Sequence, residues 1–152
     1  MHIVWTPNYQ IGIEVIDNQH RRIVEYINEV YAVREKQEPR GRLAEVLFDL
    51  VDYTMSHFAF EEALMDEAGY PDIALHRLTH DTFTRQIQTF KKRFEGGEDI
   101  AEDLANMLQR WLLEHIVTDD VSYSEVVKRQ IVHPAHDHHN WVKKAIDKFF
   151  AS

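Results

Sequence analysis

Histidines and a carboxylate interrupt the apolar stripes of predicted helices, and this feature limits the possible folds more than any other. Within residues 57–80, His57 and Glu61 are four residues apart, and so are His76 and His80. Side chains four apart share one face of an α-helix. That face is otherwise apolar in both helices, so these four groups fall where core side chains belong. Burying an unpaired polar group costs about 1–3 kcal/mol, so we expect a partner inside the core, with a metal as the foremost candidate.

Glycine and proline divide most of the chain into four long helical segments joined by short turns. The segments are residues 17–35, 42–68, 72–94 and 99–117. We expect Asp17 to cap the first helix and Gly69 to end the second, while Gly96-Gly97 ends the third. Residues 1–15 have no helical period and are expected to form an ordered N-terminal arm. The pattern predicts an all-α fold, an antiparallel up-down four-helix bundle.

The carboxyl end differs from the four stripes. Residues 121–132 suit a short helix, residues 133–140 form a His-rich turn (HPAHDHHN), and residues 141–150 have the pattern of a short amphipathic helix. We therefore assign one domain to residues 1–132. Residues 133–152 are expected to be an extra C-terminal helical tail that packs on this domain or extends it.

The composition excludes several classes of function. The 152 residues, enough for one domain with a sizeable core, include 17 basic and 26 acidic side chains, a formal charge of −9, which disfavours nucleic acid and anionic membranes as partners. The absence of cysteine excludes disulfides, zinc thiolate sites and iron–sulfur clusters. The first residues do not resemble a signal peptide, and no apolar run approaches the roughly 20 residues of a membrane span. We expect a cytoplasmic protein without membrane insertion.

Five of the ten histidines fall on inward stripes, and all four helices contribute. They are His20, His57, His76, His80 and His115. One buried histidine is more often a hydrogen-bonded core residue than a ligand, but five such placements in one bundle indicate a metal site. Five imidazoles exceed what one octahedral ion needs beside carboxylates and an outside ligand, so two ions are expected. Glu61 is one predicted bridge; the second is Asp119 or Asp120, between which the spacing from His115 does not decide.

The ligand types narrow the choice of metal. Two divalent ions, two carboxylates and one hydroxide leave a net charge of +1, which a buried site tolerates. Imidazole and oxygen ligands without sulfur favour iron or manganese, although zinc and copper also bind imidazole. Neither the His-Glu-x-x-His motif of zinc proteases nor the Glu-x-x-His motif of carboxylate-rich di-iron proteins occurs, and nucleophile-elbow, Walker and dinucleotide glycine patterns are also missing.

Four short motifs together resemble those of the bacterial hemerythrins. They are Asp17-Asn18-Gln19-His20, His57-Phe58-x-x-Glu61-Glu62, His76-x-x-x-His80 and His115-Ile116-x-x-x-Asp120. The arm is similar as well, with Trp5 and Ile11-Gly12-Ile13 leading into the first motif. The resemblance covers about residues 5–130 and includes all seven expected ligand positions.

The resemblance implies two iron ions, Fe²⁺ or Fe³⁺, in a four-helix bundle. It assigns His76, His80 and His115 to one iron. It assigns His20 and His57 to the other, which keeps a position for O2. Glu61 and Asp120 would bridge the ions together with an oxo or hydroxo group, so the resemblance selects Asp120 over Asp119.

The resemblance also implies an apolar O2 pocket lined by Phe58, Trp111 and Val117, for which plain core packing is the alternative. The tail departs from shorter members of the family. Its histidines include His136 and His139, which form either part of a solvated turn or a weak second metal site or partner surface.

The function implied is reversible O2 binding for storage, transport or delivery, without enzymatic turnover. Candidate partners are an iron donor and an oxygen-consuming enzyme. Two other functions fit the same ligands: an O2 or redox sensor that signals through a conformational change, and a di-iron reductase of peroxide or nitric oxide.

Overall fold

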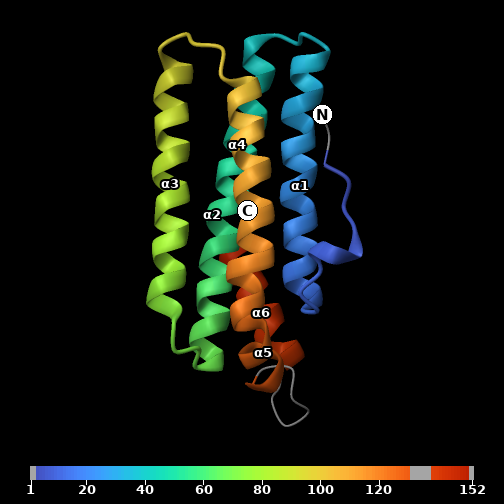
Figure 1. The fold of residues 1–152 in the computed structure, drawn as a ribbon, viewed down its shortest axis with the longest axis vertical. Helices are drawn as coiled ribbons and strands as arrows, with labels where there is room; N and C mark the ends of the chain where they lie inside the picture. Colours follow the sequence, from blue (N-terminus) through green and yellow to red (C-terminus); the bar gives the residue numbers. More distant parts are fainter. Residues whose placement is uncertain (1–2, 131–137, 151–152) are drawn as a thin grey trace.

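Four long helices run antiparallel along the long axis of the molecule (Figure 1). The computed structural model describes residues 3–130 and 138–150, and every regular element in these ranges is helical. The bundle consists of α1 (Glu14–Glu35), α2 (Arg40–Ala68), α3 (Ile73–Glu95) and α4 (Ala101–Glu114). Short turns join them, which confirms the predicted up-down bundle. None of the described helices has the length and apolar character needed to cross a bilayer.

The smaller elements lie at the two ends of the chain. They are η1 (Pro7–Tyr9), η2 (His115–Asp120), α5 (Val121–Gln130) and α6 (His138–Phe150). The arm before α1 is ordered, as expected: Ile3, Ile11 and Ile13 are buried. The backbone N–H of Ile3 donates to the side chain of Asn28 over 2.7 Å, which fastens the arm to α1.

Helix ends follow the glycine signals but not the predicted aspartate cap. Gly69 has φ 70°, and its left-handed conformation ends α2 with hydrogen bonds back to Asp66 and Met65. Asp17 is not the cap of α1, because the helix begins three residues earlier at Glu14. Its carboxylate instead accepts the backbone N–H groups of Ile11 and Gly12, at 2.8 and 3.2 Å. Asp17 therefore anchors the arm.

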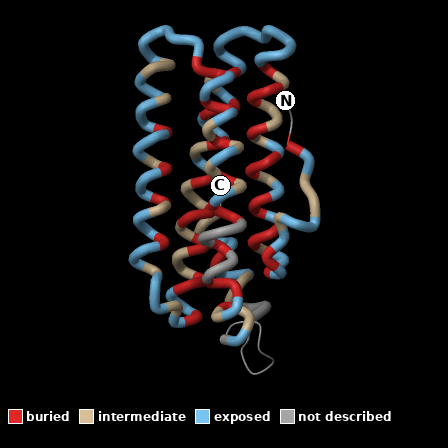
Figure 2. The backbone as a smooth tube through the Cα atoms, in the orientation of Figure 1, coloured by how far each residue is buried: buried red, intermediate tan, exposed pale blue. Residues whose placement is uncertain are grey.

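The core is a stripe of buried, mostly apolar residues along each of α1, α2 and α4, with few buried residues on α3; Figure 2 shows the buried positions in red. Ile27, Val46, Leu64 and Leu104 are all fully buried. This stripe continues without a break into the histidines, so the bundle core and the polar cluster form one interior.

The fourth helix changes its winding where the ligands are predicted. After α4 ends at Glu114, residues His115–Asp120 form the π-helix η2, and α5 continues from Val121. Hydrogen bonds in a π-helix join residues five apart instead of four, so His115 and Asp120 come onto the same face. A regular α-helix would place Asp119 on the face of His115, and the wider turn is the reason that Asp120 lies there instead.

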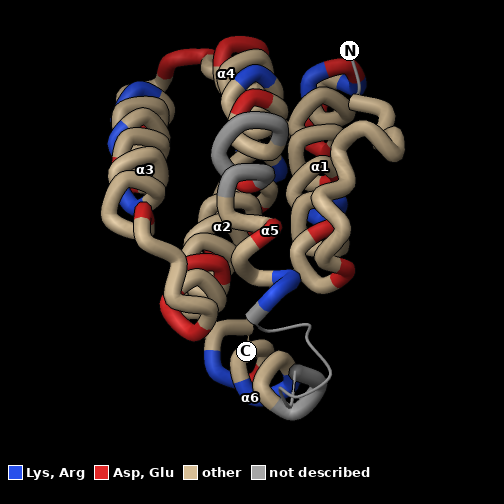
Figure 3. The backbone as a smooth tube through the Cα atoms, turned by 60° about the horizontal axis from the view of Figure 1, so that its bottom comes forward, with Lys and Arg blue, Asp and Glu red and all other residues tan. Residues whose placement is uncertain are grey.

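Helix α6 packs against α2 through aromatic rings. The ring centroid of Phe60 lies 6.0 Å from those of Trp141 and Phe150, and Ala145 between them is buried. The opposite face carries Lys143, Lys144 and Lys148, which are exposed at the end of the molecule (Figure 3). This is the amphipathic pattern that the sequence predicts.

Candidate metal centre

The bundle interior brings all seven predicted ligand residues together. They are His20 from α1, His57 and Glu61 from α2, His76 and His80 from α3, and His115 and Asp120 from η2. None of these side chains is more than 5% exposed. Their donor atoms fall into two groups that share Glu61.

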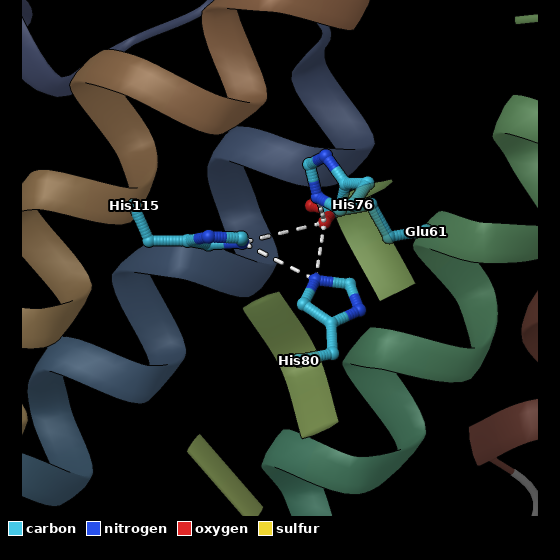
Figure 4. Close-up of side chains that lie close together, drawn as sticks. All are labelled: Glu61, His76, His80 and His115. Carbon is cyan, nitrogen blue, oxygen red and sulfur yellow. Dashed lines mark hydrogen bonds and ion pairs between the residues drawn. The ribbon is translucent and has the colours of Figure 1, made fainter. Parts of the chain in front are cut away.

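The first group contains three histidines. Figure 4 shows the imidazoles of His76, His80 and His115 directed toward the carboxylate of Glu61. Oε1 of Glu61 lies 2.8, 3.0 and 3.5 Å from the Nε2 atoms of these three histidines, in that order. The Nε2 atoms of His80 and His115 are 3.3 Å apart. Three nitrogens and one oxygen therefore surround one small volume.

The second group contains two histidines and the other oxygen of Glu61. Oε2 of Glu61 lies 3.3 Å from Nε2 of His57 and 3.8 Å from Nε2 of His20. Nε2 of His20 is also 2.8 Å from Oδ2 of Asp120. This group therefore offers two nitrogens and two carboxylate oxygens.

Both carboxylates divide their oxygens between the two groups. Oδ1 of Asp120 lies 3.0 Å from Nε2 of His115 and 3.2 Å from Nε2 of His76, while Oδ2 faces His20. Glu61 divides its oxygens in the same way. This arrangement is the one that two carboxylates need in order to bridge two ions.

The contacts suit metal ligation better than direct hydrogen bonding. Nε2 of His20, Nε2 of His57 and both carboxylate oxygens of Asp120 are buried and face other ligand atoms at short distances, yet within the described part of the chain none of them has the geometry of a hydrogen bond. Bonds of about 2.1 Å to an octahedral ion place neighbouring ligand atoms about 3 Å apart. Several of the distances above fall close to this value, so the residues present fit a metal pair.

Without a metal, the carboxylates hold protons on two of the imidazoles. Burial opposes the charged form of His20, but Asp120 and Glu61 outweigh it and raise the pKa of His20 to about 9. The pKa of His76 is raised to about 9 for the same reason. Burial lowers the pKa of His57. Although burial also opposes their ionisation, the surrounding imidazoles hold the pKa values of Glu61 and Asp120 below the usual range for carboxyl groups.

Comparison with known proteins accounts for this geometry. Residues 11–123 match the family model described as the Hemerythrin HHE cation binding domain. The chain belongs to the hemerythrin family. The Bacteriohemerythrin of Stenotrophomonas maltophilia (strain R551-3) is 43% identical over 150 residues, which is 97% of each chain. The Bacteriohemerythrin of Pseudomonas aeruginosa (strain LESB58) is 41% identical over 151 residues, or 98% of each chain.

A solved structure agrees with the fold of this hemerythrin domain and shows that members differ in length. A crystal structure of wild-type hemerythrin matches with a TM-score of 0.76 and 28% identity. The match covers 82% of this chain and 97% of that chain. The relatives from Stenotrophomonas and Pseudomonas match along almost the whole chain, so they share its additional length, which the crystallised hemerythrin lacks.

Two of the three predicted pocket residues lie against the three-histidine group of the hemerythrin domain. The ring of Phe58 stacks on His80, with centroids 3.8 Å apart, and Trp111 stacks on His115 at 4.6 Å. These contacts fix the orientation of both imidazoles. The side chain of Val117 lies outside the described part of the structure, so the O2 pocket stays a prediction.

Sequence reasoning missed two polar side chains beside the ligands. Tyr123 of α5 is fully buried and donates its hydroxyl to Oε2 of Glu61 over 3.1 Å. Gln19 of α1 lies 2.7 Å from Nδ1 of His57. Tyr123 follows Asp120 by three residues, a spacing that puts both side chains on one helix face. This spacing could have indicated that Tyr123 lies beside the ligands. Gln19 directly precedes a ligand, which gives no such signal.

The predicted second metal site falls on side chains outside the described part of the structure. His136 lies outside the described residues, and His139 is described only as part of the α6 backbone.

Proposed function

We propose that this chain binds O2 reversibly at a pair of iron ions. In this proposal, His76, His80 and His115 hold one ion, and His20 and His57 hold the other. Glu61 and Asp120 bridge the two, together with an oxo or hydroxo group. Storage, transport and delivery to an oxygen-consuming enzyme are uses of the same chemistry, and an iron donor would supply the metal.

The shared carboxylates are the observation that carries the proposal. Glu61 directs one oxygen to each group, and Oδ1 of Asp120 contacts two histidines of the three-histidine group while Oδ2 contacts His20. Counted in this way, the three-histidine position has five protein donors and the two-histidine position has four. One bridging oxo or hydroxo group would raise the number of donors to six at the three-histidine position and five at the two-histidine position. An octahedral ion at the two-histidine position would then have one position left for an outside ligand.

A ferrous pair supplies the electrons with which O2 is bound. The chain supplies a buried site that keeps bulk water away and holds the donors in place. Phe58 and Trp111 contribute to this role, since they cover the imidazoles of His80 and His115 with apolar rings. Family membership supports this proposal, because hemerythrins are oxygen-binding proteins and not enzymes.

Anaerobic reconstitution tests the proposal directly. Metal-free protein is loaded with ferrous salt under nitrogen, the bound iron is counted, and visible spectra are recorded through cycles of air and nitrogen. We expect two iron ions per chain and a spectral change on aeration that reverses under nitrogen. Fewer than two ions, or no change on aeration, would contradict the proposal.

A turnover assay separates O2 carriage from reduction chemistry. The loaded protein is mixed with a reductant and either peroxide or nitric oxide, and consumption is followed over many equivalents. We expect no sustained turnover. Continuous consumption would assign a reductase function to the same site.

A further inference from the structure

Gln19 fixes the orientation of one imidazole of the site from outside the ligand set. Its side-chain oxygen lies 2.7 Å from Nδ1 of His57, and both side chains are buried. An amide oxygen only accepts a hydrogen bond, so Nδ1 of His57 must carry the proton. Nε2 of His57 is then left with its lone pair, directed at Oε2 of Glu61 and the centre of the two-histidine group.

Glu62 lies near the three-histidine group but is not hydrogen-bonded to its imidazoles as Gln19 is to His57. One of its oxygens lies 3.7 Å from Nδ1 of His80, which is too long for a hydrogen bond, and this Nδ1 has no hydrogen-bond partner within the described residues. The other oxygen accepts a hydrogen bond from Nε of Arg77 over 3.0 Å. The carboxylate side chain of Glu62 is 25% exposed, whereas Gln19 is a buried neutral amide. The two-histidine group thus has a neutral, hydrogen-bonded outer partner, while the three-histidine group has a charged neighbour beyond hydrogen-bond distance.

We propose that Gln19 is a positioning residue that holds His57 for metal binding, and that its neutral amide makes His57 a weaker donor than a carboxylate partner would. Glu62 acts on the other group only through its negative charge, 3.7 Å from His80, without accepting a hydrogen bond from it. This inference rests on the proposed function, because it concerns how the same site is tuned for reversible O2 binding.

The physical reason is the effect of an outer acceptor on imidazole. A carboxylate that accepts the Nδ1–H raises the basicity of the ring and strengthens its bond to a metal, which favours the higher oxidation state of that metal. An amide has the same geometry with a smaller effect. A neutral partner at the position where O2 binds would therefore slow irreversible oxidation of the iron.

A matched set of variants tests positioning and charge separately. Gln19→Met removes the acceptor at similar volume, Gln19→Glu replaces the amide by an acid, and Glu62→Gln makes the opposite change at the other group. Gln86→Met, on the exposed face of α3, is the control for the loss of a glutamine. Metal affinity is measured with Co²⁺, whose visible absorption reports coordination without O2. Reduction potential and autoxidation rate are measured on the iron-loaded proteins.

We expect Gln19→Met to lower the affinity for one of the two Co²⁺ ions by about tenfold or more and to leave the affinity for the second ion unchanged. Gln19→Glu should lower the reduction potential and speed autoxidation, while Glu62→Gln should raise the potential and slow autoxidation. Unchanged Co²⁺ affinity in Gln19→Met, or potentials that fail to move in opposite directions, would overturn the inference. Failure of the parent protein to bind two irons or to cycle with O2 refutes the proposed function instead.

Discussion

Helices α1 and α3 lie on opposite sides of the bundle and are held there by different interactions (Figure 1). Helix α1 buries ten of its 22 residues, and seven of these ten are apolar. Helix α3 buries only four of its 23 residues. The four are His76, His80, Phe83 and Ile87, so half of them are predicted metal ligands. Figure 2 shows the same contrast as a largely exposed α3.

The contrast indicates that the metal pair is part of the core on the α3 side. Apolar burial contributes about 25 cal/mol for each Å² removed from water, and α3 has few buried apolar side chains to provide it. Leu75 and Leu78 of α3 are 65% and 57% exposed. Ile73, Phe90 and Phe94 of α3 are only partly buried against the core, so we expect ligation of the two histidines to supply much of the force that docks this helix.

Removal of the metal should produce the largest effect and should act unevenly. A ligand present at a thousand times its Kd adds about 4 kcal/mol of stability, which is about 10 °C in Tm for a chain of this size. We expect the metal-free protein to lose at least this much. Amide hydrogen exchange should speed up most in α3 and least in α1. Equal Tm values with and without metal, or uniform loss of protection, would contradict the comparison.

Truncation of Phe83 should loosen the metal as well as the fold. Its ring is buried and lies 4.0 Å from that of Trp111 and 5.5 Å from that of Phe58. Phe83→Ala should cost about 3–5 kcal/mol and free α3 from its neighbours. The rate of iron loss to a chelator measures this second effect.

Ile27→Ala on α1 is the matched control. Ile27 is fully buried, so its truncation also costs about 2–5 kcal/mol, but no ligand depends on it for docking. Iron loss should be clearly faster in Phe83→Ala than in Ile27→Ala. Equal rates of iron loss in the two variants would show that packing of Phe83 is not needed to hold α3 and its ligands at the site.

The metal-free protein should be less stable at alkaline pH. The pKa values of His20 on α1 and His76 on α3 rise from 6.5 to about 9 on folding. Their contribution is therefore fully present below pH 6.5 and is lost as pH rises through 9. Chemical denaturation from pH 6.5 to 9.5 should show falling stability in the metal-free protein.

The same pH series on metal-loaded protein is the control. Bound metal needs deprotonated imidazoles, so the alkaline loss should disappear. A parallel decline in both forms would mean that groups other than these two histidines cause the alkaline loss of stability.

The sequence was sufficient for the bundle and for the set of residues that converge, because both depend on helical periodicity. Histidines on apolar stripes must lie in the bundle interior once four helices pack together. Periodicity does not extend to the choice between Asp119 and Asp120, since a π-helix breaks the α-helical period at that position. Family resemblance selected Asp120, which the structure places in the cluster.

Contacts between different helices were harder to predict. Asp17 has the residue type of a helix cap, but its carboxylate binds the arm, and only tertiary structure shows that the backbone of Ile11 and Gly12 lies within reach. The contacts of Gln19 with His57 and of Tyr123 with Glu61 depend on the relative rotation of neighbouring helices. A stripe defines the buried face of one helix but not this rotation.

A smaller effect is expected at the apolar cover of the site. Trp111 of α4 stacks on His115 and also contacts Phe83 of α3, so it links the metal group to the weakly held helix. Trp111→Ala should speed autoxidation by admitting water, by about tenfold or less in this peripheral position. The lifetime of the oxygenated form measures this. An unchanged lifetime would remove Trp111 from the predicted O2 pocket.

The smallest effect should come from the outer face of α3. Leu78 is 57% exposed, so if α3 is held only by its inner stripe and its ligands, Leu78→Gln should change stability by no more than about 0.5 kcal/mol. The denaturation midpoint of the metal-loaded protein measures this, with Ile87→Gln on the buried face as the contrast. A loss above about 1 kcal/mol for Leu78→Gln would mean that this face packs against something in solution. Helix α3 would then have a second source of burial, and its contrast with α1 would no longer require the metal.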